Sequence, residues 1–299
     1  MATFEVVAMV LAPERHIVAF TAHYRRRGAD RIRIFFDGPE APKGDFHGAE
    51  VVLCNDDFWT ARGVTRPHGV EDRQRVIYNH AYGTARADWL LVVDVDEFIL
   101  GDEEIGALLE RIEPSRESVI FGSVEATYSH RDDMTGEYGA SFFRKPYGRP
   151  FCSVLPHLVT PGVGGCFTKG LLGHFMGKHA VRTGITDIKV DIHESKRNGQ
   201  PLDALIVGPG VTPRPLYLAH YDAISFQQWR DKWDRRVAKR DVLEVGRKRN
   251  LQFDLFAAAR QRGAELDLFK KLYAVNGLQV FVLRCFNLII PHKPNDLIV

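Results

Sequence analysis

The chain has 299 residues, of which 45% are hydrophobic and 26% are charged, a composition typical of a globular protein with a sizeable core. Its net charge of +2 gives no support for a nucleic-acid partner, and four scattered cysteines without a C-x-x-C pair indicate neither a zinc site nor a disulfide framework. No apolar run has membrane-spanning length and the N-terminus does not resemble a signal peptide, so we expect a cytoplasmic protein without a transmembrane segment.

The first hundred residues alternate between strand and helix patterns. Strands are predicted over 4–11, 31–36, 50–53 and 89–93, and helices over 17–27 and 69–87. This alternation predicts a mostly parallel sheet with crossover helices on both faces. Asp37 ends the second strand, where a carboxylate commonly accepts hydrogen bonds from a nucleotide. A plain Asp-Gly turn explains Asp37 equally well.

The apolar run 89–93 ends in three carboxylates, Asp94, Asp96 and Glu97. Unpaired carboxylates are expensive to bury, so we expect them at the carboxyl end of the strand, where open α/β sheets bind ligands. In an extended chain Asp94 and Asp96 point to the same side, and two oxygen ligands suit Mn²⁺ or Mg²⁺. The alternative is an acidic surface turn, which the apolar residues before and after the carboxylates disfavour.

Two histidines follow a strand predicted over 118–124 and a Pro- and Gly-rich stretch over 146–165, which is either a substrate loop or a spacer. His220 ends the apolar run 216–219, as Asp94 ends its own strand. An imidazole with two carboxylates is an acceptable Mn²⁺ ligand set. Taken singly, His193 and His220 are each more typical of structural histidines.

The last part of the chain, from Ser225 onward, has a helical pattern, with Ser225 as its N-cap. We therefore predict a first domain over 1–225 and a helical C-terminal extension over 226–299 that packs on it. The start of this extension is basic, which indicates either a solvated face or contact with an anionic substrate or the inner face of a membrane. The basic side chains are Arg235, Arg236, Lys239, Arg240, Arg247, Lys248 and Arg249.

Several of these stretches together resemble the family-2-like and family 92 glycosyltransferases. The similar segments are 18–24 with Ile34-Phe35-Phe36-Asp37, Gln74, the Trp89 to Phe98 D-x-D-E-F stretch, Lys178 to Arg182 followed by His193, and His220-Tyr221 with Ser225 and Lys232. The resemblance implies a GT-A fold and transfer of a sugar from a nucleotide sugar, such as a UDP-sugar, to a glycan or lipid-linked acceptor. Val124 and Glu125 stand where a Trp-containing segment is common, which bears on the acceptor.

The resemblance also implies roles for individual residues. Asp94, Asp96 and His220 would hold Mn²⁺ or Mg²⁺ against the diphosphate, with Asp96 taking part in catalysis. Asp37, Gln74, Lys178, Arg182 and Lys232 would bind the donor. An inverting reaction needs a base, for which Glu125, Asp191 and His193 are candidates.

Two other functions fit parts of the pattern. A phosphatase could use Asp94 as its nucleophile, but the motif lies deep in the chain and Glu97 stands where a Gly-Thr or Gly-Val pair is expected. A nucleotide- or sugar-binding protein without turnover could share the same fold. The residues leave the donor sugar, the acceptor and the stereochemical outcome open.

Overall fold

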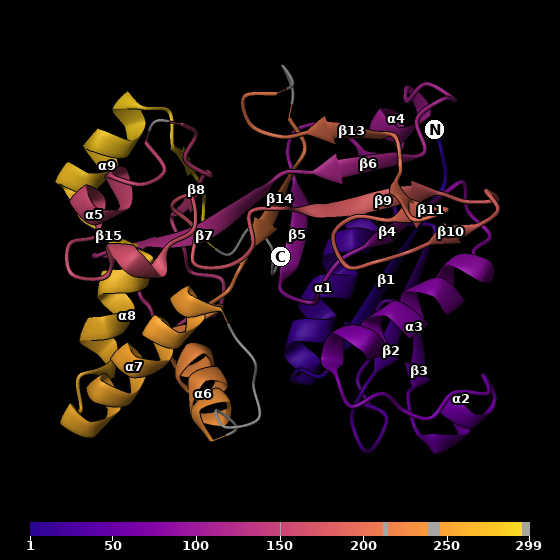
Figure 1. Ribbon diagram of the computed structural model, residues 1–299, viewed down its shortest axis with the longest axis horizontal. Coiled ribbons are helices and arrows are strands. Elements are labelled where there is room, and N and C mark those ends of the chain that lie inside the picture. Colours follow the sequence, from indigo (N-terminus) through magenta and orange to yellow (C-terminus); the bar gives the residue numbers. More distant parts are fainter. Residues whose placement is uncertain (150, 212–214, 239–245, 295–299) are drawn as a thin grey trace. The chain divides into compact units, whose positions relative to one another are not determined.

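The strands predicted for the first hundred residues form one sheet in the computed structural model, which describes residues 1–149, 151–211, 215–238 and 246–294 (Figure 1). The chain divides into two units. Unit 1 comprises Met1–Gly122 and Met176–Leu218, and unit 2 comprises Ser123–Phe175 and Ala219–Val299. This division differs from the predicted boundary at 225, because the segment 123–175 folds with the C-terminal helices instead of with the first sheet.

Unit 1 contains a seven-stranded sheet in the order β13-β6-β9-β4-β1-β2-β3. Strand β9 is antiparallel to both of its neighbours, and every other pair in the sheet is parallel. The prediction of a mostly parallel sheet is therefore confirmed. The strands are β1 Phe4–Val10, β2 Arg31–Phe36, β3 Glu50–Leu53, β4 Trp89–Val92, β6 Ser118–Phe121, β9 Lys178–Arg182 and β13 Ala204–Val207.

Helices connect these strands on both sides of the sheet. The chain passes from β1 to β2 in one direction along the sheet and from β3 to β4 in the other, and right-handed crossovers therefore place the two connecting helices on opposite faces. Val7, Leu90 and Ile77 share one apolar cluster on the α3 face. The helices are α1 Glu14–Arg26, α2 Asp56–Thr60, α3 Val70–Gly83 and α4 Ile105–Glu110; other strands are β5 Glu97–Leu100, β10 Ile188–Lys189, β11 Lys196–Arg197 and β12 Gln200–Pro201.

The strand predicted over 118–124 is split between the two units at Gly122. The Gly122 N–H donates to the carbonyl of Val207 at 2.8 Å, and a Cβ at Gly122 would lie 3.3 Å from that carbonyl oxygen. Strand β6 ends before this close approach, and β7 (Ser123–Ser129) begins after it. A glycine therefore stands at the point where the chain leaves unit 1.

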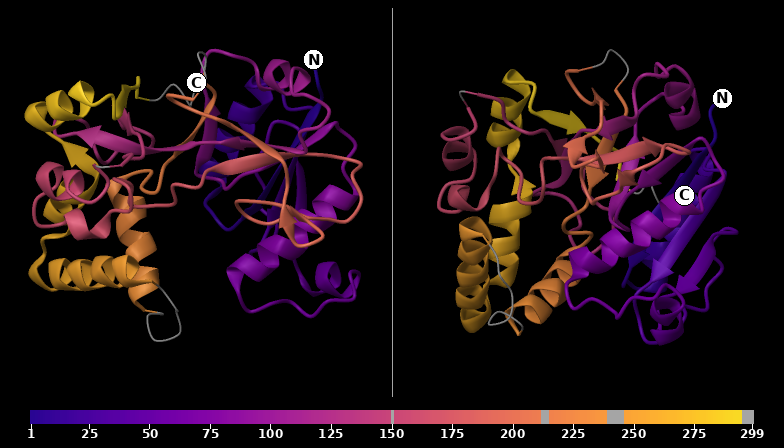
Figure 2. Two further views of the ribbon diagram at one scale, coloured as in Figure 1. Left: turned by 45° about the horizontal axis from the view of Figure 1, so that its top comes forward. Right: turned by 45° about the vertical axis from the view of Figure 1, so that its right-hand side comes forward.

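Unit 2 combines a small sheet with helices (Figure 2). Strand β8 pairs antiparallel with β7 and with β16, while β15 runs parallel to β7. The side chains of Trp229 and Trp233 are buried against aromatic rings of the neighbouring helices, and the Ser225 hydroxyl accepts from the Gln228 N–H at the predicted N-cap. The elements are β8 Phe142–Arg144, α5 Leu155–Val159, η1 Gly164–Cys166, α6 Phe226–Val237, α7 Arg247–Arg262, α8 Glu265–Tyr273, β15 Ala274–Val275, α9 Gly277–Cys285 and β16 Ile289–Pro291. Strand β14, Tyr217–His220, begins in unit 1 and ends in unit 2.

No helix in the part of the chain that the structure describes is both long enough and apolar enough to cross a membrane.

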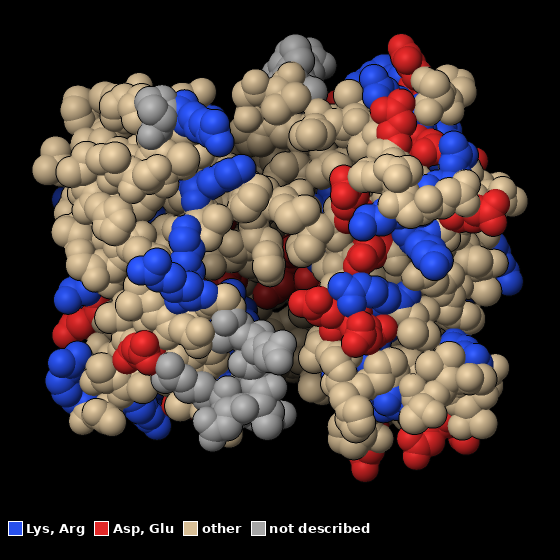
Figure 3. Space-filling view, in the orientation of Figure 1, with Lys and Arg blue, Asp and Glu red and all other residues tan. Residues whose placement is uncertain are grey.

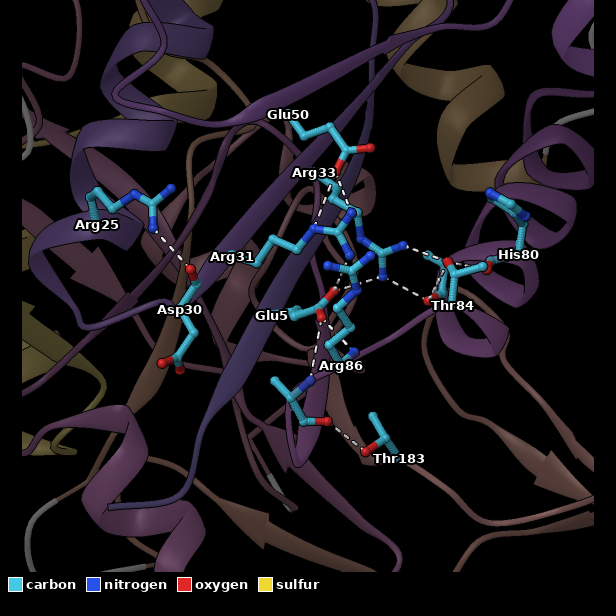
Figure 4. A network of polar contacts seen from close by, with 12 residues as sticks. Glu5, Arg25, Asp30, Arg31, Arg33, Glu50, His80, Thr84, Arg86 and Thr183 are labelled. Carbon is cyan, nitrogen blue, oxygen red and sulfur yellow. Dashed lines mark hydrogen bonds and ion pairs between the residues drawn. The ribbon is translucent and has the colours of Figure 1, made fainter.

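A buried ion pair links β1, β2 and the end of α3 (Figure 4). The Glu5 carboxylate lies 2.9 Å from the Arg33 guanidinium, and both side chains are almost fully buried. Glu5 also accepts from the Arg86 N–H at 2.6 Å, and Arg33 donates to the Thr84 hydroxyl at 2.8 Å. The pair closes the connection from α3 into β4, which carries the acidic motif.

Replacing Arg33 with Met should lower the free energy of unfolding by about 3 kcal/mol, because it removes the nearest cation from the buried Glu5 carboxylate and leaves only Arg31, at 3.6 Å. Urea unfolding followed by circular dichroism measures this loss. The double variant Glu5→Leu/Arg33→Met removes both charges and should recover most of it. Equal stability of the single variant and the parent would show that the pair contributes nothing.

His179 on β9 is a second buried group with a consequence for stability. Its Nε2 lies 2.7 Å from the Ser195 hydroxyl, and burial together with the nearby Lys178 ammonium lowers its pKa to about 3. Between about pH 3 and the ordinary histidine value of about 6.5, the unfolded chain binds a proton at this position and the folded chain does not. Stability should therefore fall as the pH falls through this window.

His179→Gln should remove this contribution to the acid sensitivity. The stability difference between parent and variant should shrink by up to about 1.4 kcal/mol for each pH unit below 6. Urea midpoints measured between pH 7 and pH 4 on both proteins test this. A difference that stays constant over the range would mean that His179 does not titrate as argued.

Candidate functional site

The strand order of unit 1 reverses next to β1. The chain moves outward from β1 to β2 and β3 and then returns to β4 on the other side of β1. In open α/β sheets, ligands bind outside the carboxyl ends of the strands at such a reversal. Asp37 directly follows β2 and Asp94 closely follows β4, so both acids lie at the ligand-binding edge.

The acidic motif forms a turn instead of an extended strand end. Strand β4 ends at Val92, and the Glu97 N–H donates to the Asp94 carbonyl at 3.0 Å. The Glu97 carboxylate in turn accepts from the Asp94 N–H at 2.8 Å. Residues 94–96 are therefore not extended, contrary to the expectation from which Asp94 and Asp96 were predicted to point to one side. Asp96 is half-buried within the turn.

Asp94 contacts two of the predicted donor-binding residues. One of its carboxylate oxygens lies 2.8 Å from the Lys178 ammonium, and the other accepts from the Gln74 amide at 3.0 Å. Lys178 is fully buried, and its ammonium also lies 3.7 Å from Glu97. Burial opposes the charged form, but the Asp94 and Glu97 carboxylates raise the pKa of Lys178 above its ordinary value. The group of Asp94, Glu97, Lys178 and Gln74 is called here the Lys178 cluster.

These contacts do not fit the prediction that Asp94 is a metal ligand. Both of its oxygens already accept from protein donors, and one donor is an ammonium that repels a divalent cation at short range. Among the described residues, no group of three or more His, Cys, Asp or Glu side chains is arranged to hold a metal ion. The assignments of Asp96, the other aspartate of the motif, and of His220 as metal ligands stay predictions.

Asp37 is held by two arginines that the sequence analysis did not single out. Its carboxylate oxygens accept from Arg66 at 2.8 Å and from Arg73 at 2.9 Å. Arg73 also donates to the carbonyls of Pro67 and His68, so the Asp37 carboxylate and the loop before α3 are fixed together. The Arg66 side chain is partly exposed and adds a cation beside the position predicted to contact the nucleotide.

The structure separates Arg182 from the Lys178 cluster. The two residues stand at opposite ends of β9, roughly 13 Å apart along an extended strand. Arg182 pairs with Trp89 at the amino end of β4, its guanidinium lies 4.4 Å from the Trp89 ring centroid, and it donates to the carbonyls of Arg116 and Ile112. These contacts hold Arg182 at the other edge of the sheet and do not support a phosphate site shared with Lys178; the role of Arg182 toward the donor stays a prediction.

Of the two candidate bases in unit 1, His193 is the better one. Asp191 accepts from Arg75 and from the Ile192 N–H, and despite burial these contacts lower its pKa. The His193 Nδ1 lies 2.9 Å from the Gly177 carbonyl, which can only accept, so Nδ1 carries the proton and Nε2 is the acceptor nitrogen. Burial and the Lys178 charge lower the His193 pKa, which keeps the imidazole neutral.

Glu125 and His220 both belong to unit 2. Glu125 is buried and accepts from the N–H groups of Leu172 and Gly173 at 2.7–3.0 Å. A Cβ at Gly173 would lie 2.7 Å from the His220 ring and 3.2 Å from a Glu125 oxygen, so the glycine allows both side chains to approach it. Burial and the Asp222 charge raise the pKa of Glu125, but its burial leaves no approach for an acceptor hydroxyl.

Lys232 forms an ion pair inside unit 2. Its ammonium lies 3.0 Å from the Asp222 carboxylate, which also accepts from the Tyr273 hydroxyl. Although burial opposes ionisation, Lys232, Arg249 and His220 lower the pKa of Asp222 well below its ordinary value. The observed contact of Lys232 is therefore structural, and its role toward phosphate stays a prediction.

The sequence analysis missed Asp222 and Tyr273, which have no motif, and also Arg144. The latter is buried opposite Glu125 in the β7–β8 register. The only sequence signal for Arg144 is a charged residue next to the apolar pair Phe142-Phe143, which predicts a half-buried strand equally well.

The chain was also compared with known proteins. No protein-family model matches it, and no curated protein matches it. Among solved structures, a mycobacterial protein is 18% identical with a TM-score of 0.30, over 60% of this chain and 53% of its own length. TarS from S. aureus (residues 1–349) is 9% identical with a TM-score of 0.34; the match covers 82% of this chain and 67% of the TarS chain. The mannosyltransferase PcManGT from Pyrobaculum calidifontis, solved with GDP-Man and Mn²⁺, is 11% identical with a TM-score of 0.34. This match covers 96% of this chain and 79% of the PcManGT chain. These similarities do not assign the chain to a family.

Lys178→Met should destabilise the protein by about 3 kcal/mol or more, because it leaves the Asp94 and Glu97 carboxylates without the ammonium between them. Adding Asp94→Asn to this variant should recover part of the loss, and a double-mutant cycle on urea unfolding measures the coupling. Additive effects of the two changes would contradict the ion pair.

Proposed function

We propose that this protein is a glycosyltransferase that moves a sugar from a nucleotide-diphosphate sugar to a hydroxyl group of a glycan or a lipid-linked acceptor. The observation that carries the proposal is the Lys178 cluster, which holds a buried ammonium and an oriented carboxylate at the strand-order reversal of the sheet. A nucleotide is the type of ligand that this position binds in open α/β sheets. The similarity of the surrounding motifs to glycosyltransferases supports the same reading, and a GT-A fold is part of the proposal.

In the proposed reaction the acceptor oxygen forms a bond to C1 of the sugar, and the bond between C1 and the diphosphate oxygen breaks. The electron pair of the broken bond leaves with the nucleoside diphosphate, and the proton of the acceptor hydroxyl passes to a base. Lys178 and Gln74 each contact one oxygen of Asp94, and in the proposed site the remaining lone pairs of these oxygens accept hydrogen bonds from donor hydroxyls. Arg66 beside Asp37 supplies a positive charge at the same edge.

His193 is the base that the contacts support best. A general base must present a lone pair and be unprotonated at the working pH, and the Gly177 carbonyl leaves Nε2 as the acceptor nitrogen. Burial and the Lys178 charge lower the pKa of His193, so its imidazole is unprotonated at neutral pH. Asp191 is bound to Arg75 and Glu125 is buried, so both are weaker candidates.

A divalent cation is part of the proposal, with Asp96 as the ligand that unit 1 would supply. When bound, Mn²⁺ or Mg²⁺ would neutralise the charge that develops on the leaving diphosphate. Asp94 is not included, because the Lys178 ammonium 2.8 Å from its carboxylate repels a divalent cation.

Donor binding and turnover can be tested with the purified chain. UDP-sugars and GDP-sugars, GDP-mannose included, are screened by thermal shift with Mn²⁺, and hydrolysis of the stabilising donor is then measured. Asp96→Asn should abolish the metal-dependent shift and His193→Gln should lower kcat by about 100-fold or more with little change in KM. Asp57→Asn, an exposed carboxylate on α2, is the matched control.

The alternatives predict different results in the same assays. A binding protein without turnover would show the thermal shift but no hydrolysis. A phosphatase that uses Asp94 as nucleophile would hydrolyse p-nitrophenyl phosphate and ignore the sugar nucleotides. Either outcome would overturn the proposal.

A further inference from the structure

Helix α9 is apolar on more than one side and lies at the surface of unit 2. Leu283 on its inner side is buried in an apolar cluster that includes Leu155 of α5. On its outer side Leu278 is 72% exposed and Phe281 is 63% exposed. A surface helix normally presents polar side chains to water, so this outer side is suited to a non-aqueous neighbour.

Helix α5 extends the same apolar surface. The Gln279 side chain of α9 donates to the Val159 carbonyl of α5, and the Phe151 and Phe286 rings lie 4.9 Å apart. These contacts hold the two helices together, and Leu158 of α5 is 72% exposed. The α5–α9 surface is defined by its large exposed apolar side chains, Phe151, Val154, Leu158, Leu278, Phe281 and Phe286.

A groove of about 450 Å³ runs into this surface between the two helices. Gln279 is the single polar side chain in its lining, and the Gln279 amide is already bonded to Val159. The volume lies within the range of roughly 300–1,000 Å³ typical of small-molecule sites. With this lining, the groove suits an unbranched hydrocarbon chain better than a polar ligand.

The segments that form the α5–α9 surface contain no acidic residue. Residues 138–175 and 268–294 include neither Asp nor Glu, while besides the buried Arg144 they include seven basic residues: Lys145, Arg149, Lys169, Lys270, Lys271, Arg284 and Lys293. Figure 3 shows no red side chain over α5 and α9, and blue side chains border the apolar area. The charge around the surface therefore complements an anionic partner.

We propose that the α5–α9 surface docks on an anionic lipid membrane, with the outer side chains of α9 entering the acyl region and a lipid chain occupying the groove. Interfacial binding of this kind grows with buried apolar area and with attraction of basic residues to anionic headgroups. A second copy of the chain fits less well, because a symmetric contact would bring the same basic border against itself.

In the part of the chain that the structure describes, three side chains of the basic region expected from sequence to contact a membrane are engaged in contacts within unit 2. Lys248 donates to the Phe167 carbonyl, Arg249 donates to Gln252, and Arg236 stacks on Trp233, so these side chains serve the fold. Lys239 and Arg240 lie outside the described residues. The docking proposal goes beyond glycosyl transfer and does not depend on it, since membrane binding can be measured without any substrate.

Vesicle co-sedimentation of the full chain tests the docking. Phosphatidylcholine vesicles are compared with vesicles that contain phosphatidylcholine and 30 mol% phosphatidylglycerol, at low and high salt. We expect binding to the anionic vesicles that weakens as the salt concentration rises.

Leu278→Ser and Phe281→Ser should each lower the partition coefficient by about tenfold, whereas Leu11→Ser, which removes an equally exposed leucine (71%) from unit 1, should leave it unchanged.

Three outcomes would overturn the proposal. Circular dichroism checks that Leu278→Ser and Phe281→Ser fold; folded variants that bind vesicles as the parent does would exclude the α5–α9 surface as the docking site. Absence of binding to either vesicle type would exclude a membrane partner. A concentration-dependent dimer that both substitutions abolish, seen by sedimentation velocity, would assign the surface to a second copy.

Discussion

The ion pair between the buried Lys178 ammonium and the Asp94 carboxylate is the contact on which the candidate site depends. A charged lysine without a partner could not remain buried at this depth, so the position of Lys178 determines where carboxylates must lie. Asp94 and Glu97 both satisfy it, and the turn that joins them is closed by their own backbone and side-chain hydrogen bonds. The acidic motif therefore has one geometry because a cation is fixed beneath it.

The direction of β9 explains the location of this cation. Strand β9 runs antiparallel to β4, so its first residue lies near the carboxyl end of β4 and its last residue lies at the amino end. Lys178 is the first residue and Arg182 is the last. Had β9 been parallel, Arg182 would stand near the acidic turn and Lys178 at the opposite edge. A single antiparallel strand in a mostly parallel sheet thus brings the lysine to the ligand-binding edge.

This direction also marks the limit of what the sequence could predict. The apolar runs and their alternation with helices predicted β1 to β4 and the helices α1 and α3, because local periodicity depends only on neighbouring residues. Strand direction depends on pairing with distant segments, and the pattern of β9 reads the same in either sense. Lys178 and Arg182 are the two ends of β9, so in either direction only one of them could lie at the ligand-binding edge. The expected pointing of Asp94 and Asp96 failed because a carboxylate three residues later, Glu97, closes a turn.

Unit 2 shows a related limit. Glu125 was a candidate base and Lys232 a candidate donor-binding residue, yet both side chains are engaged within the unit, by backbone N–H groups and by Asp222. Burial of this kind comes from packing between segments distant in the chain, 123–175 and 219–299, which a single sequence does not report. The apolar helix α9 was readable as a helix, but an apolar pattern does not distinguish a side packed in a core from one facing a membrane.

Glycosyl transfer is proposed for unit 1 and membrane docking for unit 2, and together the two proposals favour one class of acceptor. If the α5–α9 surface holds the chain on a membrane, an acceptor anchored in the same membrane is confined near the protein and its effective concentration rises without any new contact. A water-soluble glycan gains nothing from the vesicles. Addition of anionic vesicles should therefore lower the apparent KM for a lipid-linked acceptor and leave that for a soluble glycan unchanged. Leu278 and Phe281 are not part of the Lys178 cluster. Leu278→Ser and Phe281→Ser should therefore remove the effect of vesicles on the apparent KM while leaving donor hydrolysis unchanged. This result would distinguish a role in membrane binding from a role in catalysis.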